Sequence, residues 1–342
     1  MNRRDFLKNA STLGGAMLVA PGLLRSIEIA GPPPSLARVA FVKTTDRAAG
    51  VARAVDLLEL GKFGSRDLFL KPNFNSADST PGSTSEETLA AIVKKLKTLG
   101  AGLLTIGDRS GMGNTREVMD RKHAFTLGRE LGARVIVFDE LDADGWERLK
   151  PSGSHWQQGF AIPRVVRQAG GIVQTCCLKT HRFGGHFTLS LKNSVGFAAK
   201  TVPGNSYNFM RELHSSPDQR RMIAEINTAY RPDLIVLDGV QAFTHGGPDE
   251  GKLVNSQVIL AGTDRVAIDA VGVALLRHFG TTPEVSRGAI FEQEQIARAV
   301  QLGIGVSGPE QIELITGDPE SAAYAKQIRA VLHGAPGAAT AA

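Results

Sequence analysis

The feature that most constrains the fold is an alternation of short apolar runs with segments of helical periodicity, which continues from residue 38 to about residue 320. Strand and helix patterns that alternate in this way favour a parallel sheet with helices packed on its faces. The expected strands lie at 38–42, 67–70, 103–106, 135–138, 171–177, 234–237, 258–261 and 312–315. We therefore predict an α/β fold with three layers: a mostly parallel sheet or sheets flanked by helices. Two α/β subdomains that share one cleft are also consistent with this pattern.

Helices are expected at 84–99, 217–230 and 264–279. The first has Ser83 or Thr84 as a candidate N-cap and Gly100 just after its end, which are common signals at helix termini. The third is apolar on most sides, which predicts a buried helix, and Asp264 is its candidate N-cap.

Composition allows a core of ordinary size. The chain has 342 residues, of which 42% are hydrophobic and 21% charged, and this excludes wholly disordered, collagen-like and polytopic membrane classes. A glycine-rich stretch at 142–159 interrupts the alternation, so we place a boundary between an N-terminal half, 38–150, and a C-terminal half, 151–320. The Ala- and Gly-rich residues 334–342 are expected to form a flexible tail.

The N-terminal segment has the pattern of an export signal. Arg3 and Arg4 precede Phe6 and Leu7, and an apolar run of about 15 residues follows, shorter than the ~20 that a membrane-spanning helix needs. The arginine pair resembles signals of the twin-arginine route, which exports folded proteins. We expect residues 1–30 to be this signal and 31–37 a Pro-rich linker. The expected location is periplasmic or otherwise extracytoplasmic, with the twin-arginine machinery as a partner and no stable membrane span.

The net charge argues against a nucleic-acid partner. The formal charge is +5, but residues 1–31 contain four basic and two acidic side chains, so the remainder carries only +3. A nucleic-acid-binding domain would show a more concentrated basic surface.

Polar side chains follow several of the predicted strands. Lys71 and Asn73 come after 67–70, Asp108 and Ser110 after 103–106, Lys179 and His181 after 171–177, and Asp238 after 234–237. Because ligands bind outside the carboxyl ends of strands in open parallel sheets, we expect these residues to share one cleft. Each of them taken alone is also compatible with an ordinary turn.

The densest group of polar residues is the segment 179–196, KTHRFGGHFTLSLKNSVG. Lysine, arginine and histidine side chains in this number would hold an anion such as a carboxylate or phosphate. Its candidate ligand-binding residues are Lys179, His186, Lys192 and Asn193. His181 and His186 are five residues apart, which matches no common zinc spacing, so we expect His181 to act in proton transfer instead.

The motifs LFLKPNF (68–74), GDRSG (107–111), CLKTHRF with TLSLKNSVGF (177–197) and PDLIVLDGVQAFTHGGPDEG (232–251) resemble those of the bacterial and archaeal family catalogued as domain of unknown function 362. The resemblance extends from residue 38 to about 317. It implies an α/β fold and a candidate site, but no settled reaction. Some relatives carry ferredoxin-like cysteine runs, whereas this chain has only Cys176 and Cys177, so no iron–sulfur cluster is expected. These two cysteines end an apolar run, which favours buried, inert thiols over a redox switch.

Carboxylates could supply a metal site. Asp108 and Asp238 both follow strands, and if they met they would hold a divalent cation such as magnesium or calcium through oxygen ligands.

These observations predict an exported protein that binds a small anionic molecule and acts on it, with a divalent metal as a candidate cofactor. Lys71, Lys179 and Lys192 would contact the anion, Asn73, Ser110 and Asn193 would orient it, and His181 with Asp108 would transfer protons. The alternative is a non-catalytic periplasmic carrier or maturation protein. A third hypothesis is a racemase-like use of the two histidines of this segment. It rests on Gly184, Gly185 and His186, which are distantly similar to the His- and Gly-bearing segment of nickel-pincer lactate racemases.

Overall fold

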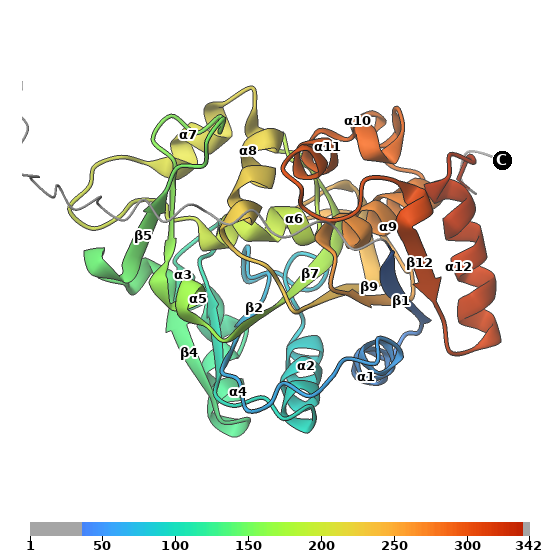
Figure 1. Cartoon of the computed structure of the whole chain (residues 1–342), viewed down its shortest axis with the longest axis horizontal. Coiled ribbons are helices and arrows are strands. Elements are labelled where there is room, and N and C mark those ends of the chain that lie inside the picture. Colours follow the sequence, from blue (N-terminus) through green and yellow to red (C-terminus); the bar gives the residue numbers. More distant parts are fainter. Residues whose placement is uncertain (1–35, 338–342) are drawn as a thin grey trace, which may run out of the picture.

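A computed structural model describes residues 36–337. Its centre is a twisted sheet in which the strands follow the order β12-β1-β11-β9-β7-β2-β3-β4 (Figure 1). These strands are β1 (Ala37–Lys43), β2 (Leu68–Lys71), β3 (Leu104–Asp108), β4 (Ala133–Val137), β7 (Gly171–His181), β9 (Leu234–Gly246), β11 (Val258–Gly262) and β12 (Ile312–Ile315). Only β11 runs against its neighbours along this path, so the prediction of a mostly parallel sheet is confirmed.

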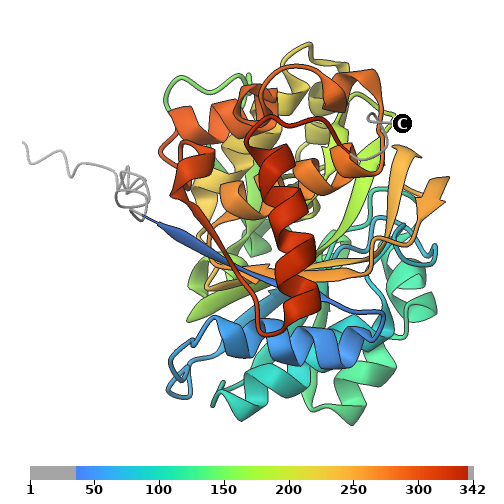
Figure 2. The same ribbon diagram turned by 90° about the vertical axis from the view of Figure 1, so that its right-hand side faces the viewer.

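Helices cover both faces of this sheet, which confirms the three layers (Figure 2). One face carries α1 (Arg47–Leu57), α2 (Glu86–Thr98), α3 (Thr115–Arg121) and α4 (Ala124–Glu130). The other carries α6 (Ser190–Asn193), α8 (Gln219–Ile226), α9 (Arg265–His278), α11 (Glu294–Gln301) and α12 (Pro319–Leu332), together with α5 (Arg164–Gln168), α7 (Phe209–Ser215) and α10 (Pro283–Ser286). Short 3-10 turns lie at Phe138–Glu140, Ala143–Gly145, Ser194–Phe197, Asn227–Ala229, Ile290–Glu292 and Pro309–Gln311.

The two-residue period of a strand explains how one sheet serves two cores. Along β1, Val39 and Phe41 pack into the cluster around α9 and α12, while Ala40 and Val42 pack into the cluster around α1 and α2. Alternate side chains point to opposite faces, so a strand that is apolar at every position is buried on both sides.

The two halves of the chain build one sheet and not two. β1, from the first half, lies between β11 and β12 from the second half, with which it pairs antiparallel and parallel. Strands of both halves therefore belong to one sheet, and the two halves do not form separate α/β subdomains. At the predicted boundary, β5 (Trp146–Leu149) and β6 (Phe160–Pro163) form a separate two-stranded sheet.

The helix predictions hold with shifted ends. The helix expected at 84–99 is α2, and its N-cap is Ser85, whose side chain accepts from the Thr88 amide. The expected caps Ser83 and Thr84 are two residues and one residue too early. Asp264 caps α9 as expected, accepting from the Ala267 amide. The helix expected at 217–230 is shorter and ends in a 3-10 turn.

Two strands are longer than their apolar runs. β7 continues through His181 because β8 (His186–Thr188) pairs with its end, and β9 continues through Gly246 because β10 (Gly251–Val254) pairs with it. A partner strand supplies hydrogen bonds to the backbone N–H and C=O groups whether the side chains of the segment are polar or apolar. Lys179, His181 and Asp238 therefore lie within strands and not in loops after them.

Some predictions concern residues outside the described range. The export signal at 1–30 and most of the linker at 31–37 are among them, and β1 already begins at Ala37. Of the predicted tail, Gly334, Ala335 and Pro336 are exposed, whereas Gly337 is buried against the Arg277 backbone. Within residues 36–337, no helix has the length and apolar character to cross a membrane.

Candidate functional site

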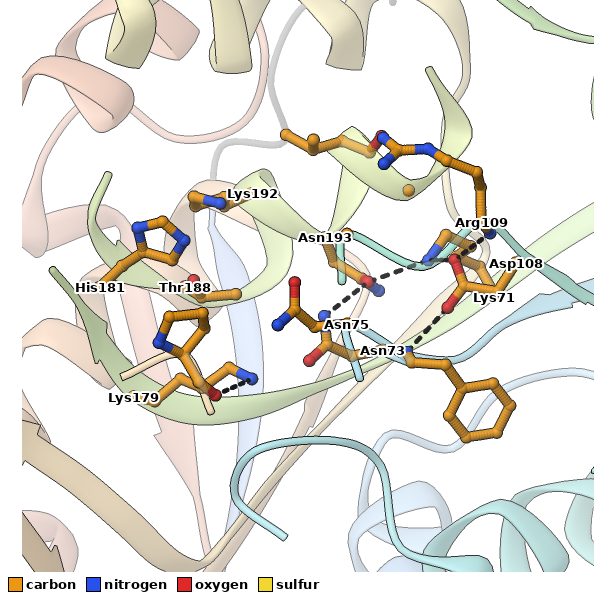
Figure 3. A pocket seen from close by; sticks show the side chains of 15 residues that line it. Lys71, Asn73, Asn75, Asp108, Arg109, Lys179, His181, Thr188, Lys192 and Asn193 are labelled. Carbon is orange, nitrogen blue, oxygen red and sulfur yellow. Dashed lines mark hydrogen bonds and ion pairs between the residues drawn. The ribbon is translucent and has the colours of Figure 1, made fainter. Parts of the chain in front are cut away.

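A cavity opens at the edge of the sheet where β2, β3 and β7 end (Figure 3). It offers about 40 Å³ of free space, room for a small group or a few waters. Its lining residues are Lys71, Asn73, Phe74, Asn75, Asp108, Arg109, Gly111, Lys179, His181, Thr188, Lys192, Asn193, Val195, Gly196 and Pro248. The structure thus brings together seven of the predicted site residues: Lys71, Asn73, Asp108, Lys179, His181, Lys192 and Asn193.

A buried ion pair forms one end of the cavity. Lys71 Nζ lies 2.6 Å from Asp108 Oδ1, and both side chains are 1% exposed. The other contacts of Lys71 Nζ are the Pro72 carbonyl at 2.7 Å and Asn193 Oδ1 at 3.2 Å, so the three donors of its ammonium are all used. Burial lowers the pKa of Lys71 and raises that of Asp108, and the attraction between the two groups opposes both shifts.

This saturation changes the roles of both residues. Asp108 also accepts from the backbone amides of Phe74 at 2.8 Å and Arg109 at 2.7 Å. No contact joins Asp108 to His181 in the described structure. Asp108 therefore neutralises Lys71, and Lys71 holds the Asn193 amide in place instead of presenting a free ammonium to a ligand.

Glycines make close approaches possible around this pair. A Cβ on Gly196 would lie 2.5 Å from Lys71 Nζ and 2.6 Å from Asp108 Oδ1. A Cβ on Gly111 would reach Asn75 Oδ1 at 2.4 Å. A contact under 3.0 Å forces the neighbouring atoms to shift. At Gly111 the atom met is the end of one side chain, whereas at Gly196 a shift would disturb the buried Lys71–Asp108 ion pair.

Helix α6 carries two of the lining side chains, Lys192 and Asn193, and its first turn is held by a carboxylate from helix α9. Asp269, on α9, accepts from the backbone amides of Ser190 at 2.7 Å and Leu191 at 3.1 Å, at the start of α6. Burial raises the pKa of Asp269 to about 8, although the hydrogen bonds from these two amides stabilise the carboxylate and oppose the shift. Asn193, at the end of α6, donates to the Thr175 carbonyl at 3.0 Å and accepts from Asn73 Nδ2 at 3.3 Å.

The other end of the cavity contains two lysines that have no carboxylate partner among the described residues. Lys179 Nζ donates to the backbone carbonyls of Gly82 and of Pro248, and its third donor has no partner within residues 36–337. Lys192 Nζ has no hydrogen bond or ion pair within residues 36–337, although Lys192 is only 8% exposed. Burial lowers the pKa of Lys179 to about 8, although the charges of Asp249 and Asp78 oppose this shift. Burial, aided by the charges of Lys179 and Arg109, lowers the pKa of Lys192 to about 7.

His181 lies beside Lys192 (Figure 3). A Cβ on Gly185 would lie 2.5 Å from Lys192 Cε and 3.0 Å from His181 Nδ1, so the two side chains converge on this glycine. Burial is the main reason that the pKa of His181 lies well below 6.5, and the charges of Lys192 and Lys179 add to it. The imidazole is therefore neutral at pH 7.

Several buried polar atoms of the lining have no partner among the described residues. They are Asn73 Oδ1, Asn75 Nδ2, His181 Nδ1 and Thr188 Oγ1. Buried polar atoms are almost always hydrogen-bonded in folded proteins, and each one left alone costs about 1–3 kcal/mol. Both donors and acceptors are present in this set, which is the pattern of a site that receives a polar ligand or ordered water.

Three predicted site residues lie elsewhere. His186 is opposite His181 in the β7–β8 pair but is not part of the lining, so the cavity contains one of the two histidines. Ser110 is buried beside the cavity, with its Oγ unpartnered within the described chain, but is not part of the lining. Asp238 is buried under α1 and α2, where it accepts from Arg47 at 2.9 Å and Thr88 at 2.7 Å.

These placements do not fit the predicted metal site. Asp108 forms an ion pair with Lys71, and Asp238 forms one with Arg47. Within residues 36–337, no group of three His, Cys, Asp or Glu side chains is placed to hold a metal ion. The carboxylate oxygens that a divalent cation needs are already neutralised.

The two cysteines are buried as free thiols. Burial raises the pKa of Cys176 and raises that of Cys177 to about 11. Since the thiolate is the reactive form, both are chemically quiet at neutral pH.

Sequence reasoning missed two residues whose polar atoms face the cavity. Asn75 is two residues after Asn73, and Thr188 is directly opposite Lys179 in the β7–β8 pair. The glycine pair between His181 and His186 could have signalled this hairpin, and with it the face that Thr188 shares with Lys179. Arg109 was also missed; it donates to the carbonyls of Ala198 and Val195 and so holds the loop that carries Gly196.

Three comparisons place the chain among known proteins. It is 26% identical over 226 residues to the "Thylakoid-associated protein sll1697" of Synechocystis sp., covering 63% of this chain and 64% of that protein's length. A solved structure, that of the lactate racemase apoprotein from Thermoanaerobacterium thermosaccharolyticum, is similar with a TM-score of 0.43 and 18% identity, covering 71% of this chain and 57% of the other. A family model matches residues 68–274, more than half of the chain and the whole stretch that carries the site. The protein therefore belongs to the family described as Domain of unknown function (DUF362).

Proposed function

We propose that this protein binds a small anionic molecule, such as a short carboxylic acid, in the cavity at the ends of β2, β3 and β7. The observation that carries the proposal is the pairing of two buried, un-neutralised lysines, Lys179 and Lys192, with unpartnered polar atoms that line the same cavity. A binding site built before its ligand arrives leaves such charges and atoms unsatisfied.

Charge supports an anion over a neutral ligand. Lys71 and Asp108 cancel each other, so the uncompensated charge of the lining comes from Lys179, Lys192 and Arg109. An anion would supply the missing partner and would raise the pKa of the lysine that it pairs with toward its ordinary value. The small free volume favours a carboxylate or phosphate group over a whole nucleotide.

Binding can be measured by calorimetry with acetate, lactate, pyruvate and inorganic phosphate as probes. We expect Lys179→Gln and Lys192→Gln each to weaken the affinity about tenfold or more, because each removes a charge-assisted hydrogen bond of roughly 1.5–3 kcal/mol. Lys94→Gln is the matched control, because Lys94 is an exposed lysine on α2, away from the cavity. Affinities that stay the same in both lining variants would rule the site out.

The non-catalytic carrier is a second candidate, and one observation favours it. An acid–base pair of His181 with Asp108 needs the two side chains in contact, whereas Asp108 is occupied by Lys71. A carrier needs the lysines but not this pair. It would bind one equivalent of acid and release it unchanged, so product analysis after prolonged incubation with each probe separates a carrier from an enzyme.

We also propose that the chain is exported by the twin-arginine route and works outside the cytoplasm. Arg3 and Arg4 ahead of Phe6 and Leu7 support this proposal. Replacing both arginines by lysine should retain the protein in the cytoplasm, as judged by cell fractionation. Unchanged export of this variant would contradict the proposal.

A further inference from the structure

We propose that Lys192 is a nucleophilic amine that forms a reversible imine with the carbonyl carbon of a short oxo acid, a molecule that carries a carboxylate and a ketone or aldehyde together. This inference rests on the proposed anion site and names the class of ligand that would occupy it.

The two un-neutralised lysines differ in how their side-chain nitrogens are held. Lys179 is pinned by two backbone carbonyls, so its nitrogen is held as a donor. Lys192 has no polar partner in the described chain, and its stem is positioned by packing, with Cε against Gly185. A lysine that serves only as a fixed positive charge would be expected to find a carbonyl or carboxylate, as Lys179 and Lys71 do.

The surroundings of Lys192 are electropositive. Lys192 is surrounded by positive or neutral groups: Lys179 and His181 on β7, Arg109 after β3, and His214 on α7. Within residues 36–337, no carboxylate forms an ion pair with it. Burial among these groups destabilises the ammonium and leaves a large fraction of Lys192 as the free amine at neutral pH, and desolvation next to a second cation is a known way to activate a lysine.

The neighbouring groups meet the needs of imine formation. The free amine of Lys192 attacks the carbonyl carbon and gives a carbinolamine. The nitrogen then loses two protons in all, the carbonyl oxygen gains both, and one water leaves. His181, neutral and with Nδ1 unpartnered, lies beside Lys192 and can relay these protons.

The carboxylate of the same molecule has its own place. Lys179 keeps one free donor, and Thr188 Oγ and Asn75 Nδ2 are further unpartnered groups of the lining. A carboxylate held there and a carbonyl at Lys192 need only a short separation, which suits the small cavity. Simple acids without a carbonyl would bind to the first group and leave Lys192 unmodified.

The test traps the imine by reduction. The protein is incubated with pyruvate or glyoxylate and sodium cyanoborohydride near pH 7, and every lysine peptide is quantified by mass spectrometry. With pyruvate we expect N-(1-carboxyethyl)lysine at Lys192 at least about tenfold above exposed lysines such as Lys94, because an ordinary lysine near pKa 10.4 is almost fully protonated at this pH. Lys192→Arg, which keeps a charge but not the amine, should lose the adduct. Excess acetate should slow labelling of the wild type.

Each outcome decides the inference. Preferential labelling of Lys192 supports it. Reversible binding of pyruvate or acetate by calorimetry without an adduct at Lys192 overturns it and leaves the proposed anion site intact, whereas failure to bind any acid overturns both. Labelling of Lys192 at the same rate as Lys94 also overturns it. These readouts come from the wild-type protein, so they hold even if the arginine variant does not fold.

Discussion

Lys192 shows how a functional position can weaken the fold that contains it. Its pKa falls to about 7 in the folded protein, against an ordinary value near 10.5, so between these pH values the unfolded chain binds more protons than the folded one. Stability therefore rises with pH across this window as the penalty for a buried ammonium disappears. In the absence of ligand, Lys192→Met should unfold less readily than the wild type at pH 6–7.

The size of this gain follows from the shift. At about 1.4 kcal/mol per pKa unit it is on the order of 5 kcal/mol at most, and it should shrink toward zero near pH 10.5. Taking the difference between the two proteins in denaturant unfolding from pH 6 to 10 removes the contributions of other titrating groups. A difference that does not change with pH would mean that Lys192 is not held in this environment.

Gly196 tests the packing around the ion pair. In Gly196→Ala the new methyl group would meet Lys71 Nζ and Asp108 Oδ1, and the pair must separate. We expect a loss of about 1–3 kcal/mol in stability together with weaker acid binding. The control is Gly61→Ala, where a Cβ meets nothing within 4 Å. Equal behaviour of the two variants in thermal unfolding and calorimetry would contradict the close packing described here.

Among the elements, the short helix α6 depends on a carboxylate from another helix. Asp269 accepts from the first amides of α6 and touches no part of the cavity, so it acts as a positioning residue for Lys192 and Asn193. Asp269→Ala should reduce both stability and acid affinity, because α6 loses its anchor. Asp318→Ala removes a comparable carboxylate, the N-cap of α12, and should cost about 1 kcal/mol of stability without changing affinity. If the Asp269→Ala variant binds acids as tightly as the Asp318→Ala control, Asp269 does not position Lys192 and Asn193.

Asp238 joins elements rather than building the site. It links β9 to α1 through Arg47 and to α2 through Thr88. Asp238→Asn should lower the free energy of unfolding by about 3–5 kcal/mol, because it leaves a largely buried guanidinium without its counter-ion, while acid binding persists in the folded fraction. Thermal unfolding with and without magnesium or calcium provides the second readout. Stabilisation of the wild type, but not of this variant, by either cation would restore Asp238 as a metal ligand.

For the whole molecule, the interleaved sheet predicts cooperative unfolding. β1 has both of its neighbours, β11 and β12, in the other half of the chain, and β2, β3 and β4 of the first half join the sheet through β7. We expect a single calorimetric transition, and we expect residues 38–150 expressed alone to lack protected amides in hydrogen exchange. Two separate transitions, or a folded fragment, would show that the halves are independent after all.

The layered α/β fold was predictable because its signals are local. A buried strand needs a short apolar run, and α2 and α9 need apolar residues at helical spacing and a cap, and each can be recognised within a window of a few residues. The order of the strands could not be predicted in this way. The insertion of β11 between β1 and β9, opposite in direction to both, depends on pairing between residues more than 200 positions apart along the chain.

The same division holds for the site. By itself the sequence determined that Lys71, Asn73, Asp108 and Lys179 would lie at one edge of the sheet, because strands that run parallel place their ends together. Only the tertiary structure decided which of these groups neutralise one another. In it Lys71 pairs with Asp108, Asp238 pairs with Arg47, and Lys192 lies beside a neutral His181 with no polar partner among residues 36–337. A side chain's charge and reactivity are set by the atoms within a few ångströms of it and by its distance from water, and neither is written in the spacing of residues along a chain.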